Sequence, residues 1–220
     1  MRFGIFAAVA SPFAGPDVIT AMATAADESG IDSMWIPEHV VLFEDYESSY
    51  PYSPDGKVPA PADAGMLEPL TTLAFIAGVT SRIRLGTGIC LLPQRNPVYT
   101  AKEAANVDYL SGGRLDFGVG VGWLEEEFEV CNVPFAKRGK RMDEYIDLLR
   151  TLWTTNPSEH HGEFYDMPSC SLFPKPVQDR LPIYIGGESE AAMKRVARTG
   201  DGWHTFNRTP DEIPALLTRL

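Results

Sequence analysis

Residues 110–123 constrain the fold of this chain more than any other segment. They read L-S-G-G-R-L-D-F-G-V-G-V-G-W, which is typical of a helix that ends on paired glycines before a buried strand begins at Leu115. Glycines at positions 118, 120 and 122 then leave the carboxyl end of that strand without side chains. Ligands of α/β proteins bind at this end of the sheet, so the bare backbone predicts a flat ligand against it. The alternative is a glycine-loosened strand that closes a tight barrel.

Strand and helix patterns alternate along the chain, which predicts a parallel α/β sheet with right-handed crossovers, as in a βα barrel. Six strands are expected, beginning near residues 3, 33, 83, 115, 183 and 202. A complete eight-unit barrel typically takes about 250 residues, so the last two βα units are expected to be absent from these 220. We expect either a truncated form of a longer sequence or a gap closed by a second subunit, as in a homodimer.

Two long irregular segments interrupt this alternation within one expected domain, residues 1–220. Residues 40–66 leave the carboxyl end of the second strand and are expected to lie over the ligand face; a solvent-exposed insertion without a role is the alternative. Residues 154–180 are expected to form a small packed excursion with an architectural role. Its neighbouring histidines, His160 and His161, are expected in a loop.

Composition excludes several classes of partner. A net charge of -11 argues against nucleic acid and anionic membrane surfaces, and no apolar run approaches the roughly 20 residues that span a bilayer. The three cysteines, Cys90, Cys131 and Cys170, form no C-x-x-C pair. This pattern predicts a reduced, cytoplasmic protein without a metal or disulfide framework, and its partner is expected to be a small-molecule substrate.

Three polar features are candidates for chemistry. Glu38 and His39 fall at the carboxyl end of the second strand, where an imidazole can shuttle a proton, although His39 can equally be a rim residue bonded to its neighbours. The turn at 186–189 joins a strand to a helix and suits a phosphate. The basic run at 137–141 lies at a helix start, where a bound anion would offset the unfavourable dipole; a solvated helix start is the alternative.

Four segments together resemble the bacterial luciferase-like flavin and deazaflavin oxidoreductases. These are G-T-G-I-C-L-L-P-Q-R-N-P (86–97), the segment 110–123, the helix R-M-D-E-Y-I-D-L-L-R-T-L-W (141–153), and P-I-Y-I-G-G followed by G-D-G-W. The resemblance covers essentially the whole chain and is strongest to the actinobacterial branch that uses coenzyme F-420. It implies a TIM-type barrel of the luciferase-like type, with the coenzyme across the carboxyl rim.

By that resemblance, Glu38 and His39 match the acidic-His pair beside the deazaflavin ring, and Gly88 and Ile89 match a cis peptide bulge behind it. The segments implied to lie under the ring and along the coenzyme tail are Gly120, Val121, Gly122 and Trp123, and Ile185, Gly186, Gly187 and Glu188. Trp123 stands where related sugar-phosphate dehydrogenases have a catalytic acid, so that activity is not expected.

The resemblance thus implies hydride transfer between coenzyme F-420 and a small organic substrate, with His39 as the catalytic residue that moves one proton. Three aromatic residues are expected either to line the pocket for the ring and substrate or to belong to the core: Phe6, Trp35 and Trp123. Two alternatives stay open: an FMN-dependent monooxygenase, and a flavin-binding protein without catalysis.

Overall fold

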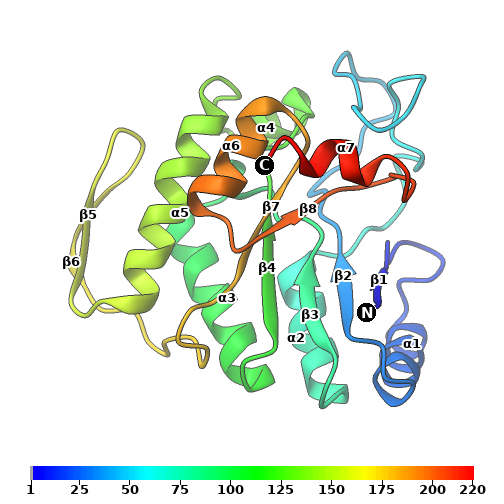
Figure 1. The fold of residues 1–220 in the computed structure, drawn as a ribbon, viewed down its shortest axis with the longest axis horizontal. Coiled ribbons are helices and arrows are strands. Elements are labelled where there is room, and N and C mark those ends of the chain that lie inside the picture. The colour runs from blue at the N-terminus through cyan, green and yellow to red at the C-terminus, as the bar shows by residue number, and fades with distance from the viewer. Residues whose placement is uncertain (1) are drawn as a thin grey trace.

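The computed structural model describes residues 2–220 as one curled parallel sheet with helices packed outside it (Figure 1). The sheet order is β1-β2-β3-β4-β7-β8, and its strands are β1 (Gly4–Phe6), β2 (Ser33–Ile36), β3 (Arg84–Thr87), β4 (Leu115–Val119), β7 (Ile183–Gly186) and β8 (Gly202–His204). The rings of Phe6 on β1 and His204 on β8 lie 6.3 Å apart, although these strands end the sheet order on opposite sides. The sheet therefore curls into an incomplete barrel, which confirms the predicted fold class.

The helices form a row around this sheet. They are α1 (Pro16–Glu28), α2 (Pro69–Val79), α3 (Pro97–Ser111), α4 (Glu125–Val130), α5 (Arg138–Thr154), α6 (Glu190–Thr199) and α7 (Ile213–Leu217), with a 3-10 turn, η1 (Leu92–Gln94). Neighbouring pairs pack in chain order, α1 on α2, α2 on α3 and α3 on α5. The buried side chains of Phe117, Leu85 and Ile183 form the core between sheet and helices.

Local sequence signals explain where the main helices begin. Proline occupies the first turn of α1, α2 and α3, where its missing N–H removes no helical hydrogen bond. The side chain of Glu68 accepts hydrogen bonds from two N–H groups of α2, and Asn96 does the same for α3. Ser189 caps α6 through the N–H of Ala192. These caps satisfy donors that the first turn leaves unpaired, so the helix starts are encoded locally.

The structure corrects the sequence reading at two elements. Residues 154–180 contain an antiparallel hairpin, β5 (Ser158–His161) and β6 (Asp166–Cys170), so His160 and His161 lie on a strand rather than in a loop. The hairpin turn depends on a distant residue, because the carboxylate of Glu144 accepts hydrogen bonds from three successive N–H groups, those of residues 163–165. The short helix α4 was also not predicted.

The glycines of β4 make room for the chain itself. A Cβ on Gly118 would lie 2.0 Å from the Thr87 carbonyl oxygen, and one on Gly120 would lie 1.8 Å from Cδ1 of Ile89. The N–H of Cys90 donates to the Gly118 carbonyl at 2.8 Å, which ties the two segments together. The space at Gly118 and Gly120 is therefore filled by the segment after β3, and tight barrel closure, rather than a flat ligand, explains these two glycines.

We expect Gly118→Ala to lower the free energy of unfolding by about 1–3 kcal/mol, because its methyl group would meet backbone that cannot turn aside. The matched control is Gly78→Ala near the end of α2, where nothing lies within 4 Å of the new Cβ. That change should stabilise the protein by about 0.4–1 kcal/mol. Urea unfolding of both variants tests the pair. Equal stability of Gly118→Ala and the parent would show that the β3 segment moves freely.

Candidate functional site

His39 lies just beyond the carboxyl end of β2 and is held on two sides. Its Nδ1 is 3.3 Å from Oε2 of Glu127 on α4, and its ring meets the Trp123 ring edge to face at 5.8 Å. The His39 side chain is 11% exposed, and that of Glu127 is 1% exposed. No hydrogen bond reaches Nε2 from residues 2–220. Nδ1 is thus bonded to a neighbour, as in a structural rim histidine, and Nε2 is left able to exchange a proton with a ligand.

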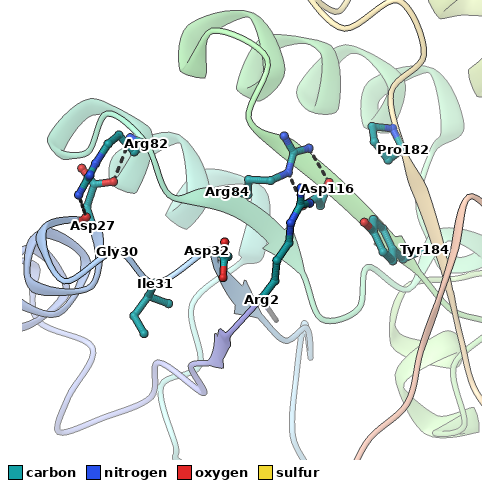
Figure 2. A pocket seen from close by; sticks show the side chains of 10 residues that line it. All are labelled: Arg2, Asp27, Gly30, Ile31, Asp32, Arg82, Arg84, Asp116, Pro182 and Tyr184. Atoms are coloured by element: carbon teal, nitrogen blue, oxygen red, sulfur yellow. Dashed lines mark hydrogen bonds and ion pairs between the residues drawn. The ribbon is translucent and has the colours of Figure 1, made fainter.

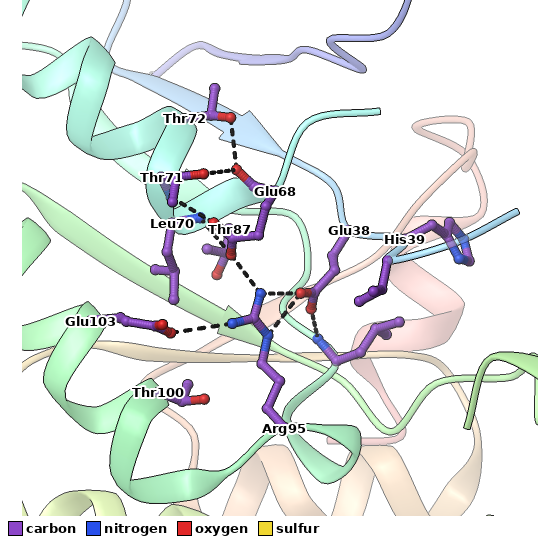
Figure 3. A network of polar contacts seen from close by, with 12 residues as sticks. Glu38, His39, Glu68, Leu70, Thr71, Thr72, Thr87, Arg95, Thr100 and Glu103 are labelled. Atoms are coloured by element: carbon purple, nitrogen blue, oxygen red, sulfur yellow. Dashed lines mark hydrogen bonds and ion pairs between the residues drawn. The ribbon is translucent and has the colours of Figure 1, made fainter. Parts of the chain in front are cut away.

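Glu38 points away from His39 and into a buried ion pair (Figure 3). Its carboxylate accepts hydrogen bonds from the guanidinium of Arg95, one of them 2.7 Å from Nε, and from the N–H of Leu91. Burial raises the pKa of the Glu38 carboxyl, and the Arg95 charge offsets part of that rise. The two side chains that the sequence pairs are therefore separated, and Glu38 holds the segment after β3 rather than facing the rim.

Arg95 is the centre of this polar network. Besides Glu38 it pairs with Glu68, the cap of α2, and with Glu103 on α3, 3.3 Å from Nη1. The network joins β2, α2, α3 and the segment after β3 in one cluster under the rim. Within that segment the peptide bond between Gly88 and Ile89 is cis, as expected. The Ile89 side chain fills the space above Gly120 and Gly186.

Aromatic rings line the rim from one side of the sheet to the other. Tyr46 and Tyr50 of the segment 40–66 pack on Trp123 at 5.6 and 5.1 Å, and Tyr52 packs on Phe206 at 5.9 Å. Phe206 in turn contacts Phe6 at 5.0 Å. The segment 40–66 thus lies over the carboxyl ends of the strands, as expected for a segment that covers a ligand face.

Trp35 and His204 occupy the interior below these rings. Their centroids are 5.2 Å apart, and Trp35 also meets Tyr184 edge to face at 5.2 Å. Phe6, at 39% exposed, is the most open of the three residues predicted to line the ring or substrate. Burial lowers the pKa of His204 to about 4, so this ring is neutral near pH 7. Sequence reasoning did not select His204 for the site, because its partners come from strands far apart in the chain.

Two glutamates of α4 fasten the segment that follows β2. Oε1 of Glu127 accepts hydrogen bonds from the N–H groups of Val40 at 2.6 Å and Val41 at 3.4 Å. Glu126 accepts from Ser48 through both its N–H and its hydroxyl, at 3.1 and 2.6 Å. Desolvation alone would raise the pKa of Glu126, but these hydrogen bonds together outweigh it and lower that pKa to about 2. Sequence reasoning missed both residues; acidic residues in a helix's first turn were the available signal.

The turn at 186–189 is bonded within the chain. The Glu188 carboxylate accepts hydrogen bonds from Arg208, at 2.9 Å from Nε, and from Thr205, and bonding to Arg208 lowers its pKa. The N–H of Gly187 donates to the His204 carbonyl at 3.2 Å. A carboxylate at the start of α6 repels an anion, so this turn suits a phosphate less than the sequence indicated.

Most of the basic run is also engaged. Lys137 pairs with Glu163 at 2.6 Å, and Arg138 donates from Nε to the Gly122 carbonyl at 3.1 Å. Arg141 is buried and donates to the Pro93 carbonyl at 2.9 Å. Lys140 is exposed. The run therefore offers less free positive charge for an acidic ligand tail than its sequence suggests.

A cavity of about 620 Å³ opens at the opposite, amino ends of the strands (Figure 2). Among its charged groups, Arg84 and Asp116 form an ion pair with N–O distances of 2.6 and 2.7 Å, and Arg82 donates to the backbone carbonyl of Asp27. None of the predicted site residues lines it. The candidate site is therefore the rim around His39 and Trp123 rather than this cavity.

Residues 2–220 contain neither a membrane-spanning helix nor a metal-binding cluster. No helix there combines the length and apolar character needed to cross a membrane. The same residues bring together no group of three or more His, Cys, Asp or Glu side chains that could hold a metal ion.

The curled sheet and its aromatic carboxyl rim define an α/β barrel protein with a candidate site at the strand ends. The chain belongs to the luciferase-like monooxygenase family, whose pattern matches residues 1–220. An uncharacterized protein of Mycobacterium tuberculosis is 40% identical over 199 residues, which cover 90% of this chain and 68% of that protein.

Two named relatives have different activities. An F-420-dependent glucose-6-phosphate dehydrogenase of Amycolatopsis mediterranei is 28% identical over 193 residues, 86% of this chain and 53% of that protein. The crystal structure of monooxygenase RslO1 from Streptomyces bottropensis superposes with a TM-score of 0.80 at 25% identity, covering all of this chain and 64% of that one. The chain thus spans about two thirds of the length of its relatives, or less.

Proposed function

We propose that this chain carries the rim of a deazaflavin-dependent oxidoreductase, which transfers a hydride between coenzyme F-420 and a small organic substrate. One observation carries the proposal: an imidazole, His39, is oriented by the buried carboxylate of Glu127 beside the ring of Trp123. Hydride transfer to or from a carbonyl or alcohol also moves one proton. A single oriented acid–base group at the rim is sufficient for that step.

The rim residues fit a flat heteroaromatic ring better than they fit a charged tail. Trp123 and Phe6 offer apolar ring faces, and His39 offers one free nitrogen. When bound there, a deazaflavin supplies the carbon that gives or accepts the hydride. In the proposal Trp123 and Phe6 orient that ring, and the backbone of Val121 and Gly122 lies along it. Nε2 of His39 holds or delivers the substrate proton.

Exclusion of water falls to the segment 40–66. Its Tyr46 and Tyr50 pack on Trp123, while the carboxylates of Glu126 and Glu127 hold its backbone. A covered rim lowers the local dielectric and strengthens the hydrogen bonds that His39 makes to a substrate. Segment 40–66 is therefore the part of the proposed site that keeps water from the reaction.

An FMN-dependent monooxygenase is the second candidate, favoured by the likeness to monooxygenase RslO1. The dehydrogenase named above is slightly more identical, at 28% over 86% of this chain, and its name specifies F-420. His39 suits simple proton transfer, and these relatives differ in chemistry. The identity of the cofactor that this chain binds is therefore the first property to measure. A flavin-binding protein without turnover is the remaining alternative.

We expect the purified protein to bind F-420 more tightly than FMN. Trp35 and Trp123 belong to the proposed site, so quenching of tryptophan fluorescence reports binding of either compound. The preference should persist in high salt, because Lys137, Arg138 and Arg141 already have partners within the chain.

Lys140→Gln provides a matched test of the exposed cation in the basic run. A fall in F-420 affinity without a fall in FMN affinity would place the acidic coenzyme tail beside it. Equal or tighter binding of FMN at low salt would support the monooxygenase alternative, and binding of neither compound would contradict both candidates.

A further inference from the structure

The Glu127 carboxylate is buried with few groups to compensate its charge. Its side chain is 1% exposed, and its one ion-pair partner within residues 2–220 is His39. Oε1 receives the N–H groups of Val40 and Val41, which leaves Oε2 facing Nδ1 of His39 at 3.3 Å. A buried carboxylate is costly unless donors surround it, so each of these contacts must supply a hydrogen.

This requirement determines which nitrogen of His39 carries the proton. An ionised carboxylate only accepts hydrogen bonds, so Nδ1 must be the donor. A neutral imidazole has a single N–H, and Nε2 is then left with a bare lone pair. The edge-to-face contact with Trp123, at 78° between the planes, restrains the ring from the other side.

We infer that Glu127 is a positioning residue, which holds His39 as the Nδ1–H tautomer and so makes Nε2 the nitrogen that exchanges a proton at the rim. The inference rests on the proposed function for its catalytic meaning, although the tautomer itself does not depend on any cofactor. The same carboxylate holds the backbone of Val40, the residue that follows His39. Glu127 therefore fixes both the chain at His39 and the chemical form of its ring.

Glu127→Gln should invert the tautomer without removing the backbone contact. The single amide oxygen stays opposite the Val40 N–H, since an amide NH₂ group placed there would face another donor. The NH₂ group is then directed at Nδ1 of His39. Because two donors cannot share one hydrogen bond, Nδ1 becomes the acceptor and the proton moves to Nε2.

Two-bond proton–nitrogen correlation spectra of ¹⁵N-histidine-labelled protein distinguish the two forms at about pH 8, where an ordinary imidazole is neutral. His39→Gln identifies the His39 signals among the four histidines. We expect Nδ1–H in the parent protein and Nε2–H in Glu127→Gln. Nε2–H in the parent would overturn the inference whether or not the variant folds, and so would an unchanged tautomer in a folded variant.

Glu126→Gln is the matched control. This neighbouring carboxylate holds Ser48 and makes no contact with His39, so its replacement should leave the His39 spectrum as in the parent. A shift to Nε2–H in this variant would attribute the tautomer to the segment 40–66 as a whole and would overturn the specific role of Glu127.

Turnover separates this inference from the proposed function. If both hold, Glu127→Gln should reduce kcat by about 10²-fold or more, with a nearly unchanged Kd for the cofactor, because the ring presents the wrong nitrogen. A tautomer that inverts in a protein that binds neither F-420 nor FMN would defeat the proposed function alone. Full turnover with an unchanged tautomer in Glu127→Gln would defeat this inference alone.

Discussion

His39→Ala is expected to lower the turnover of reduced coenzyme by about 10²-fold, because it removes the one group proposed to move a proton at the rim. The free energy of unfolding should fall by about 1–3 kcal/mol, because the side chain is only 11% exposed and its removal leaves Oε2 of the buried Glu127 without its donor. Stopped-flow oxidation of the coenzyme with a carbonyl acceptor, beside a urea melt, measures both quantities.

His161→Ala supplies the matched control for this substitution. That imidazole is 66% exposed on β5 and pairs with Asp166 of the same hairpin, which lies outside α5 on the side away from the sheet (Figure 1). Its removal should leave turnover unchanged. A His39→Ala protein as active as the parent would return His39 to a structural role, bonded to Glu127 and packed on Trp123.

The sheet and its main helices were predictable because their signals are local. The apolar spacing of Met142, Ile146 and Leu149 repeats within one element, and each is buried on α5. The start of the strand at 183–186 was predicted correctly, since a short apolar run there ends on paired glycines. Predicting them required no knowledge of distant partners.

The site was less predictable because its contacts are long-range. His39 and Glu127 are 88 positions apart, and three successive glutamates in so acidic a chain are equally typical of a solvated surface. Likewise the sequence pairs Glu38 with His39, but the structure turns Glu38 toward Arg95, 57 positions away. Adjacent positions fix the backbone of two residues without fixing the directions of their side chains.

The basic run and the glycines show a second limit. Both patterns are typical of ligand contacts, and in both the chain supplies the partner: Arg138 reaches the Gly122 carbonyl, and Ile89 fills the space at Gly120. A residue type indicates which group it can meet. Only the fold determines whether that group belongs to a ligand or to the protein.

Arg95→Met should be among the most destabilising single substitutions in this chain. It leaves the Glu38 carboxylate, 1% exposed, without the guanidinium that faces it, and the expected loss is about 3–5 kcal/mol at neutral pH. Glu103→Gln, which removes the half-exposed partner of Arg95, is the control and should cost less than about 1 kcal/mol. Urea unfolding measures both free energies.

The loss in Arg95→Met should depend on pH in a direction that Glu38 dictates. Burial already raises the pKa of this carboxyl, and removal of the Arg95 charge raises it further. The folded variant then binds a proton more tightly than the unfolded chain. The loss in its free energy of unfolding, relative to the parent, should therefore shrink as pH falls from about 8 toward about 5.

Arg95→Met combined with Glu38→Gln removes the uncompensated charge and keeps an acceptor for the Leu91 N–H. This double variant should recover much of the lost stability at pH 7. A deficit that is the same at both pH values, and that the double variant does not relieve, would mean that Arg95 stabilises the fold through packing and its contacts to α2 and α3 rather than through Glu38.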